Sequence, residues 1–214
     1  MKRKTRTKIA LGFDETNNGF SILHAPFLIV TGVLGPDRRG YGTVPYGSKS
    51  NRRFFGRRET EKDEILKCVR NYLKSRTDFF YTVIPRPEKR KGSYEVNVLK
   101  SQAISSICLK FFDSLSIPES TPIYIHQIDG LRESTFVEDS VRSNLHYAGI
   151  SFPNVRVLKS SKRNMKEVIK DADMIGYYLA ALKFLLKPKK WPFKDNRVPL
   201  RSLDDLIMDR ISQE

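Results

Sequence analysis

The chain has 214 residues, with 39 lysines and arginines against 24 aspartates and glutamates, and its formal net charge is +15. This length fits one domain with additions, and no apolar run is long enough to cross a bilayer. So large a positive charge favours a polyanionic partner, nucleic acid before an anionic membrane, and we expect no membrane partner.

The N-terminal segment and the cysteines indicate the cellular compartment of the protein. The basic start, MKRKTRTK, leads into an apolar piece that ends at Asp14 and is too short for a secretory signal peptide. Cys68 and Cys108 lie far apart in helical patterns, so we expect buried free thiols. Both features predict an intracellular, cytoplasmic protein.

The first part of the chain predicts a basic arm followed by strands. Residues 1–7 are the arm, and three apolar runs in residues 8–34 (9–13, 20–23 and 26–34) predict a three-strand antiparallel meander. The turn after the first run contains Asn17, Asn18 and Gly19, which tolerate positive φ and allow the chain to reverse.

Residues 35–58 form a glycine-rich and arginine-rich insertion with four interleaved aromatic residues. Aromatic rings can stack on bases while arginines contact phosphates, so this composition favours nucleic-acid contact. The alternative is a surface loop that two phenylalanines hold to the core. The candidate contact residues are Arg38, Arg39, Arg52, Arg53, Arg57 and Arg58.

The remainder of the chain alternates helices with strands. Helical spacing covers 60–73, 97–115 and 164–186, a polar stretch at 132–143 is a further candidate helix, and strands are predicted at 79–84, 123–128 and 155–158. This alternation predicts an α/β domain over residues 8–186, with a central mixed sheet flanked by helices. Residues 187–214 are predicted to be a C-terminal extension, held to the body by Trp191 and Phe193, with a short capped helix at 202–211.

Acidic residues follow two of the predicted strands. Asp14 and Glu15 end the first strand, and Asp129 ends the strand at 123–128. If these strands are parallel neighbours, their carboxyl ends meet at one sheet edge, where sites collect. A buried carboxylate needs a partner, and for Asp14 a capping turn and a divalent cation are equally good explanations on these residues alone.

The last long helix supplies a further acid. Asp173 lies on the small-residue flank of its apolar stripe, in line with Gly176 and Ala180, so we expect it to face the sheet and the other acids. Asp171 lies on the opposite flank and is expected to be solvated. Carboxylates that converge in this way suit two Mg²⁺ or Mn²⁺ ions, which could activate water for phosphodiester hydrolysis.

In chain order these motifs resemble the ribonuclease H-like superfamily, and most of all type 2 ribonuclease H. The similar segments are FDETNNG, YEVNVLKSQAISSICLKFF, YIHQIDGL, VRVLKSS and KDADMIGYYLAAL. The last is also similar to the Ala-Asp-Leu helix of an uncharacterised ribonuclease-H-like family that opens with Asp-Glu-Ser-Gly. The resemblance covers residues 8–186. It implies a mixed sheet with a three-strand antiparallel half and two-metal hydrolysis, with Asp14, Glu15, Asp129 and Asp173 as ligands.

The chain departs from that family at two positions. Type 2 ribonucleases H have Gly-Arg-Gly, which senses the ribose 2′-hydroxyl, where this chain has Asn17-Asn18-Gly19. By spacing, Lys183 stands in place of a serine of the family's last helix. The substrate is therefore left open among RNA, RNA–DNA hybrid and DNA.

Other polar residues are weighed separately. His24, His126 and His146 are scattered and are expected to be core or surface residues rather than general bases. Lys159 and Lys162 precede the last helix and could hold a phosphate near the metals, or simply form a solvated basic turn. The leading hypothesis is a metal-dependent nuclease, and the alternative is a catalytically silent nucleic-acid-binding protein of the same fold.

Overall fold

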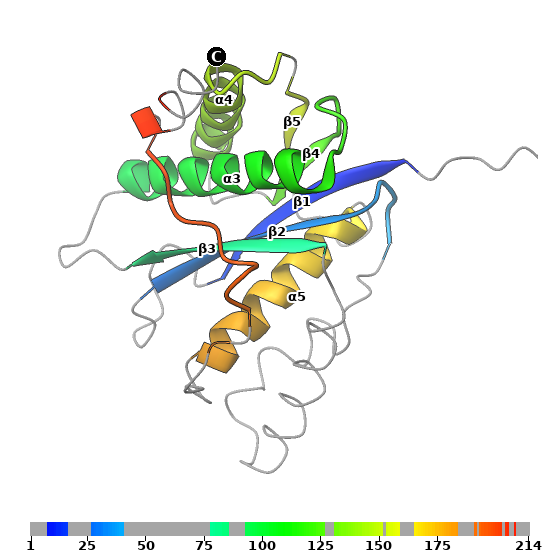
Figure 1. Ribbon diagram of the computed structural model, residues 1–214, viewed down its shortest axis with the longest axis vertical. Coiled ribbons are helices and arrows are strands. Elements are labelled where there is room, and N and C mark those ends of the chain that lie inside the picture. The colour runs from blue at the N-terminus through cyan, green and yellow to red at the C-terminus, as the bar shows by residue number, and fades with distance from the viewer. Residues whose placement is uncertain are drawn as a thin grey trace, which may run out of the picture.

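The computed structural model describes residues 8–16, 27–40, 78–85, 93–126, 131–151, 153–158, 165–183, 191, 193–202, 204–205 and 208. Within these ranges the chain forms a five-stranded mixed sheet covered by helices on both faces (Figure 1). The predicted α/β class is confirmed. No helix in the described ranges is both long enough and apolar enough to span a bilayer.

The sheet has the strand order β3-β2-β1-β4-β5. Its strands are β1 (Ile9–Thr16), β2 (Phe27–Pro36), β3 (Phe79–Pro85), β4 (Ile123–His126) and β5 (Val155–Leu158). β2 is antiparallel to both β1 and β3, whereas β4 is parallel to β1 and β5 is parallel to β4. β1 is therefore the central strand, where the antiparallel and the parallel halves meet.

The antiparallel half differs from the meander that the sequence predicts in residues 8–34. The run at 26–34 becomes β2, continues to Pro36 and pairs directly with β1. The third strand of this half is β3, which comes from the predicted strand at 79–84. The run at 20–23 and the predicted helix at 60–73 lie outside the described residues. Strand pairing is a long-range choice, and local apolar runs do not reveal which run pairs with which.

Three helices cover the sheet. α3 (Ser93–Leu115) and α4 (Leu131–Tyr147) lie on one face, and α5 (Glu167–Ala181) crosses the other (Figure 1). α3 begins four residues earlier than the helical spacing predicts, and the polar candidate at 132–143 is confirmed as part of α4. Buried Cys108 in α3 is a free thiol, as expected, and burial raises its pKa well above the ordinary value.

Side chains along β1 alternate between the two faces. Leu11 and Phe13 belong to the core cluster on the α3 side, whereas Ala10 packs with Val168 and Ile169 of α5. Successive residues of a strand point to opposite faces, so Asp14 follows Ala10 to the α5 side. The same alternation takes Glu15 to the α3 side.

Two glycines allow α5 to lie close to the sheet. A Cβ on Gly12 would come within 2.4 Å of the backbone carbon of Val168. One on Gly176 would come within 2.6 Å of Thr16 Oγ1 and 2.9 Å of Thr31 Oγ1. The close approach that the small residues of this helix predict is therefore confirmed at Gly176, and it brings the middle of α5 onto the end of β1.

The C-terminal segment runs along the free edge of β3. The backbone nitrogen of Tyr81 donates to Asn196 O, and the nitrogen of Val198 donates to Tyr81 O. Phe193 is buried and its carbonyl accepts a hydrogen bond from the Tyr81 hydroxyl, so the expected attachment of the tail is confirmed. Ser202 and Asp205 exchange the two hydrogen bonds of a capping box, as the predicted final helix requires.

Candidate acidic site at the end of strand β1

Two of the four predicted acids, Asp14 and Asp173, interact electrostatically on the α5 side of the sheet, whereas Glu15 points to the α3 side. Asp14 ends the buried part of β1, Glu15 follows it, and Asp173 projects from the middle of α5. Asp129 lies outside the described residues. The sheet and α5 thus unite residues that are far apart in the chain.

Asp14 pairs with a histidine on the neighbouring parallel strand. The β1–β4 register aligns Phe13 with Ile125, so His126 stands next to Asp14, and its Nδ1 lies 3.1 Å from Asp14 Oδ1. Burial raises the pKa of Asp14, and the His126 hydrogen bond opposes this increase. The same hydrogen bond raises the pKa of His126 to about 8, so its ring is protonated and donates at neutral pH.

The negative charge of Asp14 acts on the Asp173 carboxyl group. Its pKa is raised to about 7, first by burial and then by the negative charge of Asp14, while His126 lowers it. The negative charge of Asp14 thus disfavours the ionised form of Asp173. At neutral pH this site holds more carboxylate groups than it can readily ionise.

Glu15 has a different partner. Lys100 of α3 is buried, and its Nζ lies 2.7 Å from Glu15 Oε1. The backbone nitrogen of Glu15 also donates to Asp14 Oδ1 at 2.8 Å. The adjacent carboxylates therefore point to opposite sides of the sheet, although the charge of Glu15 still raises the pKa of Asp14.

Unpaired polar atoms surround Asp14. In the described part of the chain, three buried side-chain atoms have no hydrogen-bond partner: Thr16 Oγ1, Thr31 Oγ1 and His126 Nε2. Thr31 is the cross-strand partner of Asp14 on β2, Thr16 is two residues further along β1, and His126 is on β4. Buried polar groups in proteins are nearly always paired, so three such atoms around one carboxylate indicate a place for water, an ion or a ligand.

Asp171 does not have the environment that the sequence predicts. Its exposed fraction is 4%, so the expectation that it is solvated is wrong. The helical pattern assumes a solvent face on α5, but buried residues occur around nearly the whole helix, including polar Glu167 near its start. Asp173 remains the acid of this helix that interacts with Asp14.

The structure describes few of the predicted nucleic-acid contacts. Arg38 forms a two-point ion pair with buried Glu167 of α5, which raises the pKa of the guanidinium group. Arg39 is exposed, and its backbone forms an isolated antiparallel β-bridge with that of Lys166. The other candidates lie outside the described residues: Asn17, Asn18, Gly19, Arg52, Arg53, Arg57, Arg58, Lys159 and Lys162.

Sequence reasoning missed two residues of this site. It expected His126 to be a core or surface residue, yet β4, which is parallel to β1 and ends at His126, places this histidine beside Asp14. Lys100 was overlooked because long charged side chains are rarely buried. A signal was present, since Lys100 lies four residues after Val96 and four before Ile104, both on the buried side of α3.

The carboxylate oxygens of this site suit a hard divalent cation, but the described residues supply only part of a ligand set. Asp14 and Asp173 offer carboxylate oxygens that repel each other, which a cation would relieve. Among the described residues, no group of three or more acidic, histidine or cysteine side chains has the geometry of a metal site. Comparison of the chain with models of known protein families found no match, and comparison with curated proteins also found none.

Proposed function

We propose that this protein is a divalent-metal-dependent nuclease of the ribonuclease H-like type, which hydrolyses phosphodiester bonds of RNA, RNA–DNA hybrid or DNA. One observation carries the proposal: Asp14 of β1 and Asp173 of α5 interact electrostatically, and three buried polar atoms without partners in the described part of the chain lie on the strands around Asp14. Sites that hold carboxyl groups with raised pKa values beside unpaired buried polar atoms are typical of function rather than of stability.

The sheet supports the same proposal. The resemblance to ribonuclease H implies a three-strand antiparallel half joined to parallel strands, and the observed sheet has both parts. Asp14 lies near the carboxyl end of the central strand, beside parallel β4. Ligands of α/β sheets collect at such strand ends.

Asp14 and Asp173 would hold the cations, and Asp129 is the further predicted ligand, whereas Glu15 is paired with Lys100 on the opposite side of the sheet. Mg²⁺ and Mn²⁺ prefer carboxylate oxygens, and a bound cation would displace the proton that Asp173 retains because burial and Asp14 raise its pKa. When bound, two such ions activate a water nucleophile and stabilise the leaving oxygen of the phosphodiester.

The chain's own residues prepare this site. His126 orients Asp14 through its Nδ1–H, and Lys100 fixes Glu15 from the opposite side of the sheet. The close packing of α5 at Gly176 brings this helix onto Thr16 and Thr31 beside Asp14. Basic residues of the insertion, with Lys159 and Lys162, would hold the phosphate backbone of the substrate.

The test uses labelled single-stranded RNA, RNA–DNA hybrid and duplex DNA with Mg²⁺ or Mn²⁺. We expect cleavage that EDTA stops and that Asp14→Asn reduces by a factor of about 100 or more, since a metal ligand is lost. Exposed Asp195→Asn is the matched control and should cleave like the wild type.

A second readout does not depend on turnover. Mn²⁺ should raise the melting temperature of the wild type, because a ligand of the folded state stabilises it, and should not do so for Asp14→Asn. If neither cleavage nor a metal-dependent melting shift is observed with any substrate, the nuclease proposal is wrong.

A silent nucleic-acid-binding protein is the second candidate. The observation that favours it is that Lys100 and His126 already neutralise Glu15 and Asp14. This candidate predicts tight binding that weakens steeply with salt, through release of counterions, and no cleavage under any divalent condition.

A further inference from the structure

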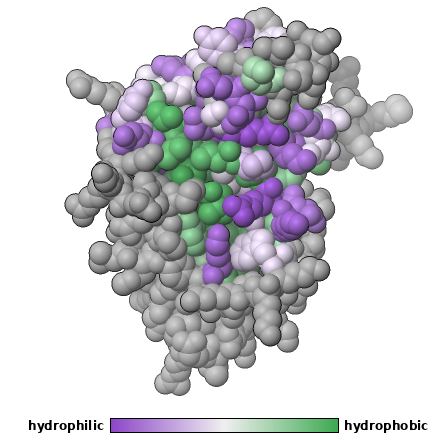
Figure 2. All heavy atoms as spheres, turned by 60° about the vertical axis from the view of Figure 1, so that its left-hand side comes forward, coloured by the Kyte–Doolittle hydropathy of each residue, from purple (hydrophilic) through white to green (hydrophobic). Residues whose placement is uncertain are grey.

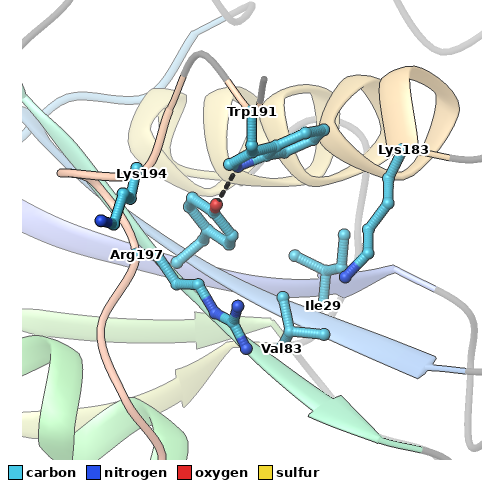
Figure 3. A pocket seen from close by; sticks show the side chains of 7 residues that line it. Ile29, Val83, Lys183, Trp191, Lys194 and Arg197 are labelled. Atoms are coloured by element: carbon cyan, nitrogen blue, oxygen red, sulfur yellow. Dashed lines mark hydrogen bonds between the residues drawn. The ribbon is translucent and has the colours of Figure 1, made fainter. Parts of the chain in front are cut away.

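A pocket lies on the α5 side of the sheet, between β2, β3, the end of α5 and the C-terminal segment (Figure 3). Its volume is about 370 Å³, within the range of about 300–1,000 Å³ typical of small-ligand sites. The lining residues are Ile29, Tyr81, Val83, Lys183, Trp191, Lys194 and Arg197. None of these is a predicted ligand of the acidic site.

The pocket has a fixed aromatic wall. Trp191 Nε1 donates a hydrogen bond to the Tyr81 hydroxyl, which in turn donates to the carbonyl of buried Phe193 (Figure 3). The indole meets the Tyr81 and Phe193 rings at interplanar angles of 67° and 82°, so neither ring stacks flat on it. The indole is thus held in one orientation without stacking on either neighbour.

The floor of the pocket is apolar. Ile29 and Val83 are paired residues on β2 and β3, and Figure 3 shows their side chains between Lys183 and Arg197. On the face of the molecule drawn in Figure 2, hydrophobic atoms are bordered by hydrophilic ones. In the pocket itself, apolar Ile29 and Val83 lie between positively charged side chains.

The charges around the pocket are all positive. Lys183, Lys194 and Arg197 line it, and the described lining residues include no acid. Burial and the charge of Arg197 lower the pKa of Lys183, so these two cations repel each other. In Figure 3 the amino group of Lys194 points away from the other two, which leaves Lys183 and Arg197 as the facing pair. Such a pair is favourable when an anion lies between its members.

We propose that this pocket binds one nucleotide, with the base against Trp191 and the apolar floor and the phosphate between Lys183 and Arg197. Stacking on an aromatic ring holds a base whatever its identity, and arginine and lysine bind phosphate. A site for free phosphate would not require the indole wall. Lys183 Nζ lies over the Phe27 ring at 4.5 Å, but an apolar ligand would leave the charges of Lys183 and Arg197 without a counter-ion among the described lining residues.

The nucleotide can come from two sources, a free mononucleotide or a residue of a nucleic-acid strand. The strand register places the pocket near the acidic site, because Ile29 pairs with Thr16, two residues beyond Asp14. The proposal does not rest on the nuclease function, since it uses none of the acids. A strand that occupied the pocket would pass close to them.

Trp191 is the only tryptophan of the chain, so its fluorescence reports on the pocket directly. The probes are adenosine 5′-monophosphate, adenosine, inorganic phosphate and a short single-stranded oligonucleotide, without divalent metal. We expect saturable quenching by the mononucleotide, and affinities at least about tenfold weaker for adenosine and for phosphate, because each lacks one half of the recognised group. Quenching by the oligonucleotide at lower concentration would assign the pocket to a strand, and quenching by the mononucleotide alone would assign it to a free nucleotide.

Two variants and one control complete the test. Lys183→Met and Arg197→Met should each raise the dissociation constant of the mononucleotide about tenfold or more. Lys110→Met removes the same charge from an exposed position on α3, across the sheet, and should leave binding unchanged. Circular dichroism confirms that each variant is folded.

Three results would overturn the proposal. They are no saturable quenching by any nucleotide, equal affinity for phosphate and mononucleotide, and equal loss of binding in Lys110→Met. Wild-type binding of the mononucleotide by Asp14→Asn would show that the pocket works independently of the acidic site. The nuclease proposal could then fail without affecting this one.

Discussion

Nδ1 of His126 lies 3.1 Å from Oδ1 of Asp14, across the junction between central β1 and parallel β4. This contact sets the charge of the acidic site, because it raises the pKa of the histidine to about 8 and opposes the burial that raises the pKa of the aspartate. The protonation of His126 and that of Asp14 therefore depend on each other, and the charges of both also affect the pKa of Asp173.

The charge of His126 should stabilise the fold below neutral pH. Its folded pKa of about 8 exceeds the ordinary 6.5, so the stabilisation is fully present below pH 6.5 and is lost as pH rises through 8. His126→Asn keeps a donor but no charge, and should lower the free energy of unfolding by about 1–2 kcal/mol at pH 6. Urea denaturation with EDTA at pH 6 and pH 9.5 measures this, and the difference should be small at pH 9.5.

Exposed His146 on α4 provides the control for this experiment. His146→Asn should leave the free energy of unfolding unchanged at both pH values. A loss in His126→Asn that is equally large at pH 9.5 would show that the ring contributes by packing rather than by charge.

Replacing Asp173 should stabilise the metal-free protein above neutral pH. The folded pKa of about 7 lies above the ordinary 3.8, so this carboxyl favours the fold below pH 3.8 and progressively less as pH rises through 7. Asp173→Asn removes the ionisation and should raise the free energy of unfolding at pH 8 by about 1–3 kcal/mol. Urea denaturation with EDTA gives the value.

Exposed Asp195→Asn should change stability by less than about 0.5 kcal/mol under the same conditions. If Asp173→Asn proves less stable than the wild type at pH 8, the account of burial and repulsion by Asp14 is wrong. In a separate measurement, Mn²⁺ should raise the free energy of unfolding of the wild type more than that of Asp173→Asn, because only the wild type retains both predicted ligands.

Lys100 should be important for stability because it pairs with Glu15 in the interior. The Lys100 side chain is 4% exposed, and its removal leaves the Glu15 carboxylate without a cation. Lys100→Met should lower the free energy of unfolding by about 3 kcal/mol, and adding Glu15→Gln should restore part of it. A double-mutant cycle measured by denaturation isolates the pair.

An exposed ion pair on α4 serves as comparison. Arg142 contacts Glu138 at 2.8 Å, but its side chain is 44% exposed, so Arg142→Met should cost less than about 1 kcal/mol. Additive losses for Lys100→Met and Glu15→Gln would show that the two residues act independently, contrary to the contact.

The packing of α5 on β1 should not tolerate a methyl group at Gly12. The added Cβ would lie 2.4 Å from the backbone carbon of Val168, and backbone atoms cannot rotate away. Gly12→Ala should therefore destabilise the protein by about 1–3 kcal/mol, measured by thermal and urea unfolding.

Gly40→Ala is the matched control, because among the described residues its Cβ would come no closer than 3.4 Å, to Oε2 of the Glu167 side chain. Its effect should stay within about 0.5 kcal/mol. A Gly12→Ala variant as stable as the wild type would mean that α5 lies further from the strand than the structure places it.

Local patterns determined much of this fold. Alternating apolar residues predicted β1, β3 and β5, and helical spacing predicted α3 and α5, because both periodicities depend only on residues close in the chain. The same reasoning placed Asp14 at a strand end and Asp173 on the sheet side of its helix, and the electrostatic coupling of the two agrees with that placement. It also predicted that the basic chain would contain an acidic centre.

Tertiary structure decided which strands are neighbours and which charged side chains are in contact. The sequence could not show that β3, rather than a nearer run, completes the antiparallel half, because strands choose neighbours by burying whole faces. Nor could it show that His126 and Lys100 reach Asp14 and Glu15, since each contact joins two elements whose separation only packing fixes. Burial then shifts the pKa values of Asp14 and Asp173, and the extent of burial cannot be read from the local sequence. The sequence therefore determined the elements and their acids, whereas the packing of α3, α5 and β4 around the end of β1 decided which charges meet there.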